Sequence, residues 1–97
     1  MNGSAKQIAW ANEIRNRMLR GCEAVRTEYL NDNPAPEKVQ RAMSIIDAAI
    51  ASINEEQEAK WFIDNRDAWI DVSWVKKIAK SRARQTWSGT NGFNSIR

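Results

Sequence analysis

The stretch Trp61-Phe62-Ile63-Asp64-Asn65-Arg66-Asp67, continued by Ala68-Trp69-Ile70-Asp71-Val72-Ser73-Trp74-Val75, decides how this chain is arranged. It holds three of the five tryptophans, and it separates two segments of helical periodicity from a third that is strongly basic. Asp and Asn favour turns and helix caps, so residues 64–67 predict a break in the helical pattern. We expect the aromatic residues to pack the last helix against the first two. The break is expected to set the direction of that last helix.

A first helix is predicted to begin after Ser4. Ser4 and Gln7 have the spacing of a capping box, in which each side chain bonds the backbone amide of the other residue. From Ile8 to Tyr29, apolar residues recur at helical spacing on one face. Gly21 lies inside this helix, where glycine costs about 0.8 to 1.0 kcal/mol relative to alanine, so we expect a close contact there.

A second helix is predicted after residues 31–36. The two prolines of this segment end the first helix and start the next, with Asn33 or Ala35 as the N-cap. An apolar stripe then runs from Val39 to Ile53, with polar residues on the opposite face. The pattern leaves open whether this helix continues to about Ile63.

A last helix is predicted to start between Asp67 and Ser73 and to stop near Gly89. Alternation typical of strands is missing from the sequence, so we expect an all-α fold, a small bundle of three or four helices. We expect residues 1–87 to form one helical domain and residues 88–97 a mobile tail. In the core we expect Trp74 and one of Trp61 and Phe62, because large rings remove much apolar area from water.

Composition bounds the class of protein. A chain of 97 residues with 42% apolar and 28% charged residues is typical of one small globular domain. Apolar runs long enough for a membrane span or a signal peptide are missing, so we expect a soluble protein in the cytoplasm, with no membrane partner. One cysteine and no histidine argue against an intrachain disulfide, a zinc site or a Cys-His nucleophile, and we expect no cofactor.

The aspartates of the central stretch are candidates for metal binding or acid-base catalysis. Asp64, Asp67 and Asp71 would share one face of a helix, where carboxylates can bind a divalent cation or act in acid-base catalysis. Their spacing lacks the alternating ligands and the glycine bend of a calcium loop. We interpret them as caps and solvated acids, paired with Arg66 or Lys60, and predict no catalytic residue and no metal site.

Charge changes sign along the chain. Residues 54–71 carry six acids against two bases, whereas residues 72–97 carry six bases and no acid. Bases interleaved with aromatic residues are typical of surfaces that bind nucleic acid or acidic partners. Cations near a helix C-terminus and the acids upstream offer a structural alternative, in which the bases are neutralised within the fold. The predicted binding residues are Lys76, Lys77, Lys80, Arg84, Trp87 and Trp69.

Two segments resemble motifs of known proteins. Residues 6–15, KQIAWANEIR, resemble a "KQIxWAxxIR" opening, and residues 60–67, KWFIDNRD, resemble a "KWWIDNRD" block. Both belong to small uncharacterised proteins encoded by phages and other mobile elements, and Phe62 replaces the second tryptophan of the block. The resemblance implies a context rather than an activity. Small phage proteins are often accessory factors or inhibitors of host defence, including anti-CRISPR proteins, which commonly occupy a partner or nucleic-acid surface.

Three functions follow in order of preference. The first is a non-enzymatic binding protein of mobile-element type, an anti-defence inhibitor that docks its basic helix on a host protein or protein–nucleic acid complex. The second is direct binding of DNA or RNA, marked by steep salt dependence. A metal-dependent nuclease is a distant third. A homodimer also fits the wide apolar face of the first helix and the many tryptophans.

Overall fold

The chain folds as a small all-α bundle of four helices within its described part. The computed structural model describes the backbone of residues 1–89 and the side chains of residues 1–81. The helices are α1 (Ala5–Asn31), α2 (Pro36–Glu55), α3 (Ala59–Asp64) and α4 (Val72–Gly89). The predicted fold class is therefore confirmed. Most of the predicted tail, residues 90–97, lies outside the described residues.

The start of α1 follows from its capping box. The Gln7 amide donates to Ser4 Oγ at 3.2 Å, and the Ser4 amide donates to Gln7 Oε1 at 2.9 Å. Two of the amides that a helix N-terminus leaves unpaired are thereby satisfied. The predicted cap is confirmed.

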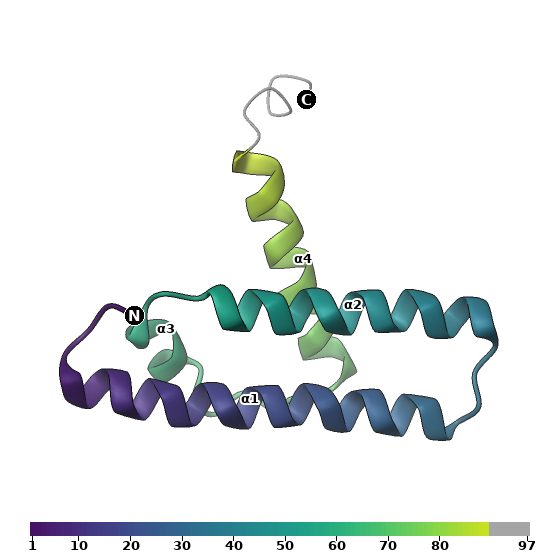
Figure 1. Cartoon of the computed structure of the whole chain (residues 1–97), viewed down its shortest axis with the longest axis horizontal. Coiled ribbons are helices and arrows are strands. Elements are labelled where there is room, and N and C mark those ends of the chain that lie inside the picture. The colour runs from purple at the N-terminus through teal and green to yellow at the C-terminus, as the bar shows by residue number, and fades with distance from the viewer. Residues whose placement is uncertain (90–97) are drawn as a thin grey trace.

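A tight connection turns the chain from α1 into α2. Asn33 adopts a left-handed φ of 51°, which Asn tolerates better than most residues. Ala35 is the N-cap of α2, and Pro36 occupies the first turn, where no amide donor is needed. The two helices consequently run antiparallel, side by side along the long axis of the molecule (Figure 1).

Arg26 links the two long helices. Its guanidinium donates to Asp47 of α2 at 2.8 Å and to Glu23 of α1 at 2.9 Å, and it approaches the Met43 sulfur at 3.2 Å. The bond to Asp47, followed by the bond to Glu23, raises the pKa of Arg26, so the pair stays charged. Because the side chain is only partly exposed, this bridge helps to keep α1 and α2 in register.

The question whether α2 continues to Ile63 is answered by a break at residues 56–58. Helix α3 is separate, and its start is held by the N-terminal segment. The Asn2 amide donates to the Gln57 carbonyl at 2.6 Å, and the Ala59 amide donates to the Asn2 carbonyl at 2.9 Å. These bonds form a single β-type bridge between Asn2 and Glu58. Helix α3 is thereby folded back against α1 instead of prolonging α2.

One apolar core joins all four helices. Phe62 is completely buried and Trp74 nearly so, which confirms the expectation for the aromatic core. Trp61 is half-buried and meets the Phe62 ring edge-on, with 5.1 Å between the ring centres. The buried residues are Ala11, Ile14, Met18, Cys22, Val25, Ile46, Ala49, Ile53, Ala59, Phe62, Trp74, Val75 and Ile78.

The turn after α3 is fastened to α1. Arg17 of α1 donates to the Arg66 carbonyl, and the Arg66 guanidinium lies over the Trp10 ring at 5.5 Å. The Asn65 side chain donates to the Trp61 carbonyl at 2.7 Å, which closes the end of α3. Residues 64–67 therefore form the predicted break.

Helix α4 crosses α2 steeply and continues beyond it, so that its last turns project from the bundle (Figure 1). The Cα atoms extend 46 × 39 × 15 Å, which makes the molecule flat. Among the helices of the described residues, none combines the length and the apolar character needed to cross a bilayer.

Candidate functional site

The lysines predicted for binding lie on one exposed side of α4. Lys76, Lys77 and Lys80 are exposed, and together with Ser73 they line a shallow hollow on this helix. Positions 73, 76, 77 and 80 share a helix face because side chains three, four and seven residues apart are neighbours. We call Lys76, Lys77 and Lys80 the basic face.

The buried side of α4 explains this orientation. Asp71 caps the helix by accepting the Trp74 amide at 2.9 Å, which fixes where the first turn begins. Trp74, Val75 and Ile78 are buried against the other helices. The polar side of the helix consequently faces solvent.

The basic face has no ion-pair partner among the described side chains. Within residues 1–81, no acid forms a salt bridge with any of its three lysines. Asp64 instead pairs with Lys60 at 2.6 Å, one helical turn earlier, as the sequence indicated. Asp71 is occupied as the cap of α4. Three like charges on one helix face oppose each other, so an anionic partner would relieve that repulsion.

The structure describes no contact between the basic face and the other predicted binding residues, which are Trp69, Arg84 and Trp87. Trp69 lies in the connection before α4, so helical spacing does not place its side chain on the same face as the lysines. Its side chain is 82% exposed. Arg84 and Trp87 belong to α4 by their backbone, but their side chains lie outside the described residues.

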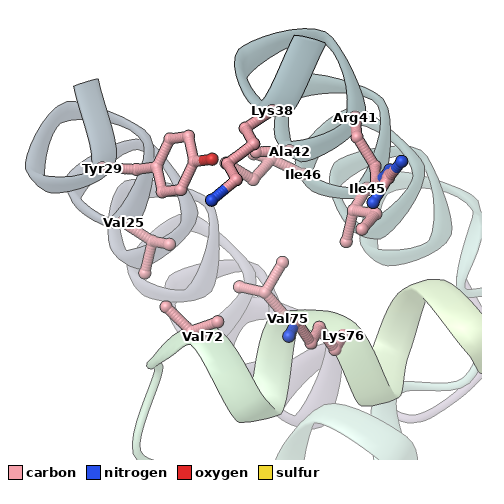
Figure 2. A pocket seen from close by; sticks show the side chains of 10 residues that line it. All are labelled: Val25, Tyr29, Lys38, Arg41, Ala42, Ile45, Ile46, Val72, Val75 and Lys76. Atoms are coloured by element: carbon pink, nitrogen blue, oxygen red, sulfur yellow. The ribbon is translucent and has the colours of Figure 1, made fainter. Parts of the chain in front are cut away.

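An apolar cleft adjoins the basic face and was missed by the sequence reasoning. Its volume is about 300 Å³, and Figure 2 shows side chains from α1, α2 and α4 pointing toward one space. Lys76 belongs to both the cleft and the basic face. Lys38 and Lys76 are far apart in the sequence, on α2 and α4, so no signal along the chain brings them together. The lining residues are Val25, Tyr29, Lys38, Arg41, Ala42, Ile45, Ile46, Val72, Val75 and Lys76.

Three cations surround this apolar space. Lys38, Arg41 and Lys76 are exposed, and within residues 1–81 none of them is in a salt bridge. We call these three residues the cationic rim. A cleft with apolar walls and a cationic rim is suited to an apolar group that carries a neighbouring negative charge.

The Cys22 thiol is built as a core residue and not as a nucleophile. Burial, followed by the negative charge of Glu23, raises the pKa of Cys22 to about 11, although the charge of Arg26 opposes the change. At about pH 8, the thiolate population is lower than that of a free cysteine by a factor on the order of 100.

We therefore expect native Cys22 to resist Ellman's reagent and to react at once in denaturant. The unfolded thiol ionises first, so the stability contributed by Cys22 is lost as pH rises from about 9 toward about 11. Absorbance of the released thiolate measures the reaction. Rapid labelling of the folded protein, checked by far-UV circular dichroism, would contradict the expectation.

The acidic residues do not assemble into a metal site within the described residues, where no group of three or more His, Cys, Asp or Glu side chains is placed to hold an ion. The basic face and the cleft beside it are therefore the features of the described surface that suit recognition.

No protein-family model matches this chain, and no curated protein or solved structure matches it either.

Proposed function

We propose that this chain is a non-enzymatic binding protein that offers the basic face of α4 to an acidic partner surface. The observation that carries the proposal is the set of three exposed lysines on one helix face, with no acid of residues 1–81 in a salt bridge to them. The interactions of the upstream aspartates support it, because Asp64 and Asp71 have other partners.

The course of α4 supports a docking role. Ala79 and Lys80 line a hollow together with Ser44 and Ala48 of α2, and the helix then continues to Gly89. At about 1.5 Å per residue, the part after Lys80 extends roughly 13 Å. A helix that projects from its bundle can enter the groove of a partner and be read along one face. Arg84 and Trp87, on this projecting part, belong to the proposed surface.

The resemblance of residues 6–15 and 60–67 to mobile-element proteins suggests the kind of partner. We propose a host protein or a protein–nucleic acid complex in the cytoplasm, with this chain acting as an anti-defence inhibitor. In a protein–nucleic acid complex, the exposed phosphates form an anionic surface, which a basic helix can occupy.

A charge reversal tests this proposal. We expect Lys77→Glu/Lys80→Glu to reduce the partner recovered from host lysate about tenfold or more, because attraction becomes repulsion at the contact. Lys6→Glu/Arg20→Glu is the matched control, since both residues are exposed on α1 and the net charge changes equally. The measurement is affinity capture followed by quantitative mass spectrometry.

Two outcomes would overturn the assignment. Equal recovery by the Lys77/Lys80 variant and the control would remove the basic face from the contact. Recovery that disappears after nuclease treatment, together with steep salt dependence of binding to purified DNA or RNA, would assign the face to nucleic acid.

A further inference from the structure

The indole of Trp69, which has an aspartate on either side in the sequence, lies close to the cleft and would fit into it. Trp69 is 82% exposed, more than any other large apolar side chain among residues 1–81. Asp67 and Asp71 precede and follow it by two residues. Exposure of so large a ring forgoes roughly 25 cal/mol for each Å² of apolar area left in water, which favours a covered state.

The cleft has the complementary properties. Its walls are apolar, its volume is about 300 Å³, and its cationic rim has no salt bridge within residues 1–81. This volume is at the lower end of small-ligand sites and admits one large side chain. The indole of the same molecule does not fill it, because that ring remains exposed to solvent.

We propose that a second copy of this chain covers the cleft, with Trp69 of each protomer seated in the cleft of the other. Asp67 is exposed and, within residues 1–81, without a salt bridge, so its carboxylate is available to the cationic rim across the interface. Asp71 stays with its own protomer as the cap of α4.

The position of Trp69 beside the cleft suits a two-fold interface. Val72 lines the cleft and follows Trp69 by three residues, so their Cα atoms are at most about 11 Å apart. An isologous dimer needs one patch that holds both the inserted group and its receptor. Residues 67–76 supply the inserted indole and one wall of the receptor together.

The dimer would also strengthen binding to an acidic partner. Lys77 and Lys80 do not line the cleft, so each protomer would keep them for a partner. Two basic faces on one particle would raise avidity for any partner that presents two acidic sites. The self-association itself does not rest on the proposed function.

Sedimentation equilibrium over a wide concentration range tests the dimer. We expect a monomer–dimer equilibrium for the unaltered chain and a dissociation constant about 30-fold higher or more for Trp69→Ala, as for a central tryptophan anchor. Trp10→Ala is the matched control: its ring is 45% exposed and carries the Arg66 guanidinium instead of flanking acids. It should change the dissociation constant less than threefold. Far-UV circular dichroism verifies the fold of each variant.

A charge exchange tests the contact between Asp67 and the cationic rim. Arg41→Glu should weaken the dimer about tenfold, and Arg41→Glu/Asp67→Arg should recover most of that loss because the opposite charges are restored.

Four results would overturn the proposal: a monomer at every concentration, a dimer unaffected by Trp69→Ala, no recovery in the double variant, or association only when nucleic acid is present. Lys77→Glu/Lys80→Glu should leave the dimer intact, so failure of the dimer and failure of the partner surface give different results.

Discussion

Replacing Phe62 by alanine is expected to lower the free energy of unfolding by about 3–5 kcal/mol, the usual range for a buried phenylalanine. Phe62 is completely buried, and it belongs to a helix of six residues. A helix this short has little stability of its own. The packing of α3 on α1 therefore depends on the buried Phe62 ring. A domain of this size has about 5–15 kcal/mol in total, so the variant approaches the limit of folding.

Urea denaturation followed by tryptophan fluorescence measures this loss. Trp61→Ala is the matched control, because the two rings are neighbours in an edge-on pair but Trp61 is only half-buried. We expect the control to lose clearly less stability. Equal losses would mean that the ring pair, rather than the burial of Phe62, holds α3.

The second large effect is expected at Gly21. A Cβ atom built there would lie 2.6 Å from Ile70 Cγ2, closer than real side chains approach. Gly21→Val should therefore lower the free energy of unfolding by about 1–3 kcal/mol, the usual cost of overpacking. The substitution also displaces Ile70 and with it the start of α4, so altered near-UV circular dichroism should accompany the loss.

Removing the obstructing side chain provides the internal test. The built Cβ atom would also lie 2.7 Å from Ile70 Cβ, so only glycine at position 70 removes the obstruction. In Gly21→Val/Ile70→Gly, the new methyl groups occupy the vacated space, so the double variant should be more stable than the sum of the single losses predicts. Ala24→Val, at an exposed position of α1, is the control and should cost only about 0.5 kcal/mol. Strict additivity of Gly21 and Ile70 would disprove the contact.

Local interactions were predictable because the residues that make them are near in sequence. The Ser4–Gln7 capping box, the proline at the start of α2 and the turn at residues 64–67 each follow from side chains within a few positions of each other. The apolar periodicity likewise identified which face of α1 is buried. The contact at Gly21 was expected from its helix position, but its partner, Ile70 of the connection before α4, was not.

Only the part of the candidate site that lies on α4 could be predicted from the sequence. The periodicity of α4 placed Lys76, Lys77 and Lys80 on one side, and the structure shows them exposed together. Trp69 does not share this helix face, because α4 begins at Val72. The cationic rim could not be predicted from the sequence. Lys38 and Arg41 line the same cleft as Lys76 only because α4 crosses α2.

The sequence by itself determined the existence of α1, α2 and α4, the capping box of α1 and the buried faces of α1 and α2, because these depend on side-chain periodicity and on hydrogen bonds between near neighbours. Only the tertiary structure decided that α2 stops at Glu55, since the N-terminal segment pairs with residues 57–59 from a distant part of the chain. It also decided how the central stretch is divided. Phe62 and Trp74 enter the core, while Trp69 remains in solvent beside a cleft formed by three helices.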